Sequence, residues 1–145
     1  MVKAIVNDPV MCRRYVYLYD GEYHALEKYS EYARMNLATI LKYIIILREK
    51  EFMNPDNKAK IHIMENMSIP FERTQLIPVM VQIPRYIAET YERYLSLTKF
   101  HRPTYYRAIV LDDIKWMVEH EENYFDNELY NEIIQIKESG TGVIV

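Results

Sequence analysis

The chain has 145 residues, of which half are hydrophobic, three are glycine and one is cysteine, and its net charge is −3. This length fits one domain with a continuous core, and the lone Cys12 excludes an internal disulfide. Net acidity also counts against indiscriminate nucleic-acid binding, which requires a basic excess. We expect one domain over residues 1–138, followed by a flexible tail at 139–145.

The sequence predicts neither a membrane segment nor a secretion signal. The longest apolar runs, residues 15–19 and 43–47, are far shorter than the ~20 residues of a membrane span. The first ten residues contain Lys3 and Asp8 and no cleavage site. We therefore expect a soluble protein inside the cell.

The first predicted helix begins at Asp8, which can accept hydrogen bonds from exposed amides, with Pro9 at its first position. Residues 15–19 then alternate aromatic and aliphatic side chains before a turn at Asp20 and Gly21. A short helix and a lone strand both fit this pattern. We favour the helix, because a strand has no evident partner.

The strongest helical pattern covers residues 22–53. Its apolar residues recur every three or four positions: Leu26, Tyr29, Ala33, Leu37, Ile40, Ile44 and Leu47. Such a helix is roughly 45 Å long at ~1.5 Å per residue, and would form the centre of a bundle. Pro55 ends it, and a further helix is predicted over residues 55–67.

Three prolines interrupt the apolar segment at residues 68–84, for which we expect a short helix and a buried, irregular crossover. A helix is then predicted over residues 84–100. Residues 103–140 contain no breaker and form one long helix or two abutting helices, and Asp126 is a candidate start for a separate last one. The apolar residues expected to be buried there are Tyr106, Ile109, Val110, Ile114, Met117, Phe125, Leu129 and Ile133. The expected fold is all-α, a four- to five-helix bundle with a long central helix.

Charge is distributed unevenly along the chain. From residue 112 onward nine acids face two lysines, a net charge of −7, whereas residues 1–111 carry +4. The acids are either the solvated side of a surface helix or a row of carboxylates that imitates nucleic-acid phosphates before a basic partner. The candidate partner-binding acids are Glu119, Glu121, Glu122, Asp126, Glu128 and Glu132.

The C-terminal tail is a second candidate contact. It is either a frayed end or a docking segment, because it finishes on three branched aliphatic residues. The residues assigned to this contact are Gly140, Gly142, Val143, Ile144 and Val145.

An opposite hypothesis uses the first half of the chain, where arginines and lysines are interspersed with tyrosines, a mixture suited to phosphates and stacking. The cations are Arg13, Arg14, Lys28, Arg34, Lys42, Arg48, Lys50, Lys58 and Lys60. Nearby glutamates can pair with them, and most of the fourteen tyrosines are expected simply to pack.

Motifs for catalysis and metal binding are weak. His62 and Glu65 are one helical turn apart, but the paired Glu-x-x-His pattern of di-metal bundles is absent. No histidine lies near Cys12 in the sequence to act as its base. The sequence also contains no phosphate loop or nucleophile elbow. We therefore expect no enzyme activity, no cofactor and no metal.

The length, the Ile/Tyr/Asn/Lys-rich composition, Asp8–Pro9, the helix predicted over residues 22–53 and the acidic last third together resemble a viral family. This is the family of RNA polymerase inhibitory proteins of archaeal two-tailed viruses, which is similar to the helical-bundle coat protein of those viruses. The resemblance implies an inhibitor in the host cytoplasm that lodges in the DNA-binding channel of the host RNA polymerase. It would compete with DNA rather than bind it, block promoter loading and restrict the clamp.

Two alternatives remain open. A virion structural protein would self-associate or contact viral DNA through its Tyr/Lys/Arg-rich first half. A small enzyme or metal-binding bundle has little support from the motifs.

Overall fold

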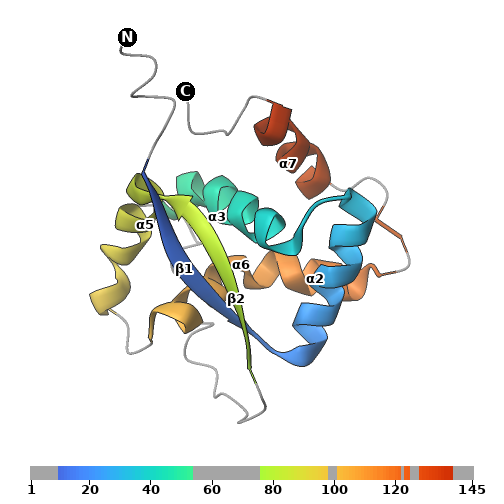
Figure 1. Cartoon of the computed structure of the whole chain (residues 1–145), viewed down its shortest axis with the longest axis horizontal. Coiled ribbons are helices and arrows are strands. Elements are labelled where there is room, and N and C mark those ends of the chain that lie inside the picture. Colours follow the sequence, from blue (N-terminus) through green and yellow to red (C-terminus); the bar gives the residue numbers. More distant parts are fainter. Residues whose placement is uncertain (1–9, 54–75, 98–100, 122, 125–127, 139–145) are drawn as a thin grey trace.

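The computed structural model describes residues 10–53, 76–97, 101–121, 123–124 and 128–138. This part of the chain is mostly helical, with five α-helices, one short 3-10 helix and a two-stranded antiparallel sheet (Figure 1). The helical content agrees with the prediction, but the sheet shows that the fold is not all-α. Three predictions fall outside the described residues: the helix over residues 55–67, the core residue Phe125 and the flexible tail at 139–145.

The sheet is formed by β1 (Met11–Leu18) and β2 (Ile77–Pro84), which are far apart in the sequence. The prediction of a helix from Asp8 through residue 19 is therefore wrong, because residues 11–18 form β1. The prediction of an irregular crossover within residues 68–84 is also wrong for residues 77–84, which form β2. The alternation at residues 15–19 indicated a strand. Its partner β2 was not predicted, because Pro78 and Pro84 are unusual in a strand.

The prolines of β2 are tolerated because of the direction of their backbone groups. The Arg85 amide donates to the Val10 carbonyl at 2.8 Å. In this register, the backbone N–H and C=O groups of the odd-numbered residues of β2 point toward β1. Backbone groups alternate in direction along a strand, so Pro78 and Pro84 face away from the ladder. Neither position needs the amide hydrogen that proline lacks.

The sheet has one inner and one outer face. Its inner face supplies the buried residues Val16, Leu18, Val79, Val81 and Ile83. These side chains pack on two helices, with β1 against α6 (Arg102–Glu119) and β2 against α3 (Leu37–Met53). Figure 1 shows the sheet lying across α3 and α6.

The predicted helix over residues 22–53 is two helices, α2 (Asp20–Ala33) and α3, so the long central helix is not present. Arg34 adopts a left-handed conformation with φ 56°, and the Met35 amide donates to the Ser30 carbonyl. Asn36 then starts α3 by accepting a hydrogen bond from the Ala38 amide at 2.8 Å. The apolar spacing runs through this break because each helix buries its own apolar residues, Leu26 and Tyr29 on α2 and Ile40 and Ile44 on α3.

The remaining helices are shorter than predicted. Helix α5 (Arg85–Glu92) begins where expected but ends early, and the 3-10 helix η1 (Leu95–Leu97) follows it. The acidic region forms two helices, α6 and α7 (Glu128–Glu138), rather than one long helix. The two do not abut as predicted, because the described residues between them, 120–121 and 123–124, are not helical. The predicted core residues of these helices are buried: Tyr106, Ile109, Val110, Ile114, Met117, Leu129 and Ile133.

Candidate interaction surfaces

The acidic segment, which we define as residues 119–138, begins at the end of α6 and continues through α7. It contains seven acids and one lysine, Lys137. Glu119 and Glu128 are exposed, and Glu121 and Glu132 are partly exposed. Glu122, Asp126 and the five tail residues fall outside the described residues.

An aromatic cluster anchors this segment to α2. The ring of Tyr124 lies 5.1 Å from that of Tyr29 and 5.0 Å from that of Tyr32. Tyr130 of α7 meets Tyr32 at 5.4 Å, and Trp116 of α6 meets Tyr29 at 6.5 Å. The end of α6 and the start of α7 are therefore held against one helix, and Glu119 and Glu128 lie on these two helix ends.

The acids divide into those with a cation partner and those without. Glu121 lies 3.6 Å from the Lys28 ammonium. Glu119, Glu128 and Glu138 form no ion pair with any residue that the structure describes. Glu132 also lacks a paired cation within that part of the chain, although its charge helps to raise the pKa of Arg48. Uncompensated carboxylates thus occur on both helices of the acidic segment.

Asp113, in contrast, serves the fold. It is buried on α6 and accepts two hydrogen bonds from Arg48 of α3, at 2.5 and 3.0 Å. These hydrogen bonds are the main cause of the raised pKa of Arg48. Glu22 of α2 is bound in the same manner by Arg107 of α6, at 2.6 and 3.0 Å. Both pairs connect helices and leave their carboxylates unavailable to a partner.

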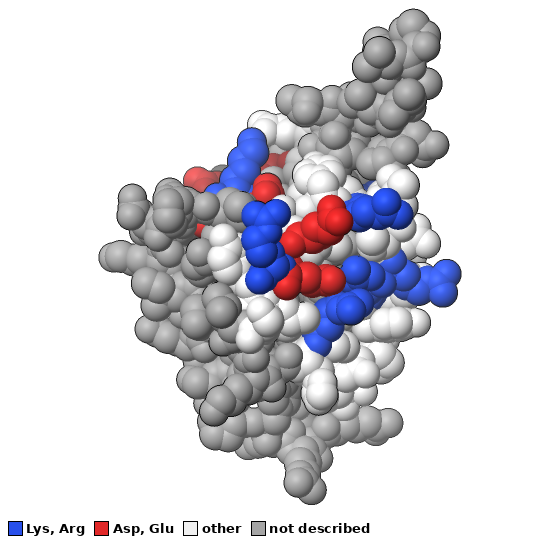
Figure 2. All heavy atoms as spheres, turned by 90° about the vertical axis from the view of Figure 1, so that its left-hand side faces the viewer, with Lys and Arg blue, Asp and Glu red and all other residues white. Residues whose placement is uncertain are grey.

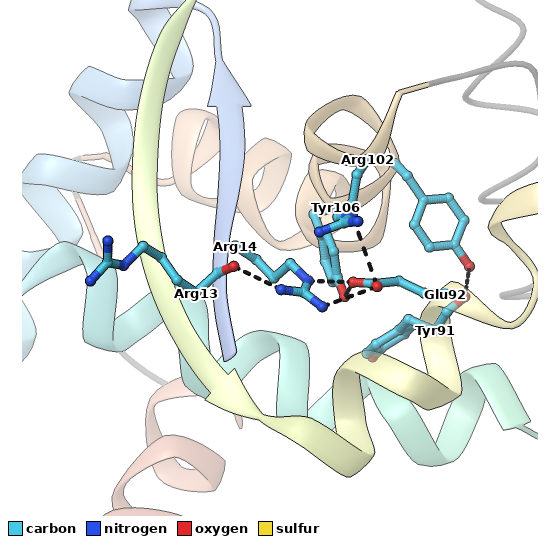
Figure 3. Close-up of polar contacts among 7 residues, drawn as sticks. Arg13, Arg14, Tyr91, Glu92, Arg102 and Tyr106 are labelled. Atoms are coloured by element: carbon cyan, nitrogen blue, oxygen red, sulfur yellow. Dashed lines mark hydrogen bonds and ion pairs between the residues drawn. The ribbon is translucent and has the colours of Figure 1, made fainter. Parts of the chain in front are cut away.

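A polar cluster that the sequence did not reveal lies where β1, α5 and α6 meet (Figure 3). Its centre is Glu92, which accepts hydrogen bonds from the Arg14 guanidinium at 2.5 and 3.2 Å and from the Tyr106 hydroxyl at 2.6 Å. Arg102 approaches the same carboxylate at 3.8 Å. The four residues come from segments up to 92 positions apart, so spacing along the chain carried no signal of the cluster.

The surroundings of Glu92 and Tyr106 shift their pKa values in opposite directions. Burial alone would raise the pKa of Glu92, but the hydrogen bonds from Arg14 and Tyr106 and the two arginine charges lower it overall. Burial, followed by the hydrogen bond to Glu92, raises the pKa of Tyr106. Glu92 therefore remains ionised and Tyr106 remains protonated at neutral pH, as an ion-pair brace between elements requires.

The outer face of the sheet is a second exposed surface, which we call the ribbon face. It consists of alternate residues of the paired strands: Met11, Arg13, Tyr15, Tyr17, Pro78, Met80 and Gln82. Tyr15 and Met80, directly opposite each other, are 44% and 40% exposed. Arg13 is exposed on this face, whereas Arg14 turns to Glu92, so the basic residues predicted to act together are separated.

Arginine predominates where the ribbon face meets α5. Arg13, Arg14, Arg85, Arg93 and Arg102 belong to these elements or border them, with Glu89 and Glu92 as the acids. Figure 2 shows Lys and Arg side chains on either side of a smaller acidic group on this side of the molecule. Arg13 and Arg85 form no ion pair with a residue that the structure describes. The region therefore has surplus positive charge.

Metal and membrane sites are not evident in the described ranges. No group of three or more His, Cys, Asp or Glu side chains there could hold a metal ion. Cys12 is half-buried in β1, while His62 and Glu65 fall outside these ranges. Among the helices that the structure describes, none is long and apolar enough to cross a membrane.

Comparison of the chain with models of protein families, with curated proteins and with solved structures found no match. Function must therefore be inferred from the two surfaces.

Proposed function

We propose that the chain is a non-enzymatic viral inhibitor of the host archaeal RNA polymerase. Its acidic segment would enter the cationic DNA-binding channel, exclude promoter DNA and restrict movement of the clamp. The observation that carries the proposal is the set of uncompensated carboxylates on α6 and α7, namely Glu119, Glu128, Glu132 and Glu138. A channel that binds DNA presents cations to phosphates, and carboxylates held on a rigid surface complement the same field.

The contrast with the other acids of α6 and α2 supports this role. Asp113 and Glu22 are each held by an arginine at 2.5–3.0 Å and brace the helices. Glu119 and Glu128 form no such pair with a residue that the structure describes, and they lie on α6 and α7, the helices that carry Trp116 and Tyr130 of the aromatic cluster. The host cytoplasm is the compartment in which this function would operate.

Binding to purified crenarchaeal RNA polymerase tests the proposal, measured by fluorescence anisotropy of the labelled chain over a range of salt. The wild-type chain should bind, and affinity should fall as salt screens the contacts. The triple variant Glu119→Lys/Glu128→Lys/Glu132→Lys should lose binding while keeping its circular dichroism spectrum.

A matched variant separates a specific surface from net charge. Glu27→Lys/Glu31→Lys/Glu89→Lys changes the charge by the same amount at exposed acids of α2 and α5. It should retain binding, apart from a modest change in association rate. Equal loss in both triple variants, or none in either, would contradict a role for the acidic segment.

A virion structural protein is the second candidate, and the ribbon face favours it. Exposed Tyr15 and Met80 beside Arg13 are typical of residues that become buried between proteins. This function predicts assembly of the purified chain into particles or filaments without polymerase.

A further inference from the structure

The ribbon face gathers much of the apolar surface that the fold leaves exposed. Seven large hydrophobic side chains are exposed in the described part of the chain. Three of them lie on the ribbon face, namely Met11, Tyr15 and Met80, and two more adjoin its end, Val10 just before β1 and Tyr86 in α5. The inner face of the sheet already completes the core, so these outer side chains are not required for it.

The composition of the ribbon face is that of a protein interface. Neither strand contains Lys, Asp or Glu, and the outer positions are occupied by Tyr, Met, Arg, Gln and Pro. Interface cores are enriched in Tyr, Met and Arg and depleted in Lys, Asp and Glu. A partner would therefore bury Tyr15 and Met80 and would supply carboxylates to Arg13 and Arg85.

The contact would use side chains rather than addition of a strand. The guanidinium of Arg14 donates to the carbonyl of Arg13 at 2.8 Å, on the side of β1 away from β2 (Figure 3). This hydrogen bond occupies an acceptor that an added strand would need. The exposed side chains of Arg13, Tyr15 and Met80 on the outer face remain available to a partner.

We propose that the ribbon face binds the acidic segment of a second copy of this chain, so that copies associate head to tail. Glu119 and Glu128 of one copy would face Arg13 and Arg85 of the next. Val118, which is 47% exposed and adjacent to Glu119, would add apolar contact. The inference rests on the acidic segment being a binding surface, as in the proposed function, but assigns it a different partner.

Position and charge both favour this arrangement. The sheet and α7 lie in separate parts of the molecule in Figure 1, so one copy can use both surfaces at once. Unlike surfaces that join without closing a ring form an open chain. Two ribbon faces related by a two-fold axis would instead bring two regions of surplus positive charge together, at a cost in repulsion.

Sedimentation velocity over a wide concentration range tests the arrangement. The wild-type chain should form a concentration-dependent ladder of species that high salt dissociates. A ribbon variant, Arg13→Gln/Arg85→Gln, and an acidic variant, Glu119→Gln/Glu128→Gln, should each be monomeric, with self-association weakened roughly tenfold or more. Neutral substitutions are used so that the two altered surfaces do not attract each other when the variants are mixed. A control variant, Lys42→Gln/Lys50→Gln on α3, should associate like wild type.

Mixing the two monomeric variants is the decisive step. The intact acidic segment of the ribbon variant can meet the intact ribbon face of the acidic variant, which predicts a one-to-one dimer that does not extend. Self-association that persists in the acidic variant, the absence of a mixed dimer, or association only when an oligonucleotide is added would overturn the proposal.

Polymerase binding separates this inference from the proposed function. The ribbon variant should still bind polymerase, because its acidic segment is unchanged. A wild-type chain that binds polymerase but remains monomeric would overturn head-to-tail association alone. A chain that forms the mixed dimer but does not bind polymerase would overturn the proposed function alone.

Discussion

Glu92→Gln should destabilise the protein, because Glu92 joins β1, α5 and α6. Its carboxylate is 19% exposed and accepts two hydrogen bonds from Arg14 and one from Tyr106. Hydrogen bonds to a charged group contribute about 1.5–3 kcal/mol each. Glutamine keeps the volume and one acceptor, so we expect a loss of about 2 kcal/mol, or a fall in Tm of about 4–8 °C.

The pH dependence of this loss tests its electrostatic cause. Because the folded-state pKa of Glu92 lies below the ordinary value of 4.5, the carboxylate stabilises the fold above that value. This contribution disappears as the pH falls through the folded-state pKa. The difference between wild type and Glu92→Gln should therefore be largest near neutral pH and should shrink below about 4.5.

Urea unfolding followed by circular dichroism, at neutral pH and at several acidic values, gives the required free energies of unfolding. Glu89→Gln is the matched control, since Glu89 is exposed on the same helix, and it should change stability by less than about 0.5 kcal/mol. An equal effect of the two substitutions, or a Glu92→Gln deficit that does not vary with pH, would refute the reasoning.

Three further predictions concern stability measured in the same unfolding assay. Asp113→Ala should cost about 2–3 kcal/mol, because it removes two hydrogen bonds from Arg48 and leaves only Glu51, at 3.4 Å, beside the guanidinium. Arg48→Met/Asp113→Leu should recover most of this loss, and no effect of Asp113→Ala would contradict the brace. Arg34→Gly should stabilise the chain by about 0.5–1 kcal/mol, since glycine adopts φ 56° without strain, and a loss of stability would count against the break between α2 and α3. Tyr91→Phe should cost about 1 kcal/mol by removing the 2.6 Å hydrogen bond to the Ile45 carbonyl, and no loss would show that this bond does not contribute.

Sequence reasoning identified the helical regions and their buried stripes well, because periodicity reports directly on burial. Ile114, Met117 and Ile133 were expected in the core and are fully buried. The break at Arg34 was missed because the apolar spacing continues across it, although Asn36 is a typical residue at a helix start.

The sheet was missed for a different reason. Alternation in residues 15–19 was recognised, but a strand forms only with a partner, and β2 lies about sixty residues further along the chain. Pro78 and Pro84 count against a strand when only the sequence is considered. The register shows that the backbone nitrogens of both prolines point away from β1, where no hydrogen bond is needed. Long-range pairing of this kind is not contained in local patterns.

The candidate surfaces were predicted only in part. The acidic residues were identified from composition, but composition did not distinguish Asp113, which braces the fold, from exposed Glu119. The ribbon face and the cluster around Glu92 depend on contacts between distant elements. Arg13 and Arg14 are neighbours in sequence, yet only the structure shows that one is exposed and the other is paired with Glu92.

Competition with promoter DNA for purified archaeal RNA polymerase tests the central claim most directly. Labelled promoter DNA would be added to polymerase preincubated with the wild-type chain or with Glu119→Lys/Glu128→Lys/Glu132→Lys, and bound DNA would be measured by anisotropy. The account predicts that the wild-type chain prevents DNA loading and the variant does not. Undiminished loading with the wild-type chain, or equal inhibition by the variant, would contradict it.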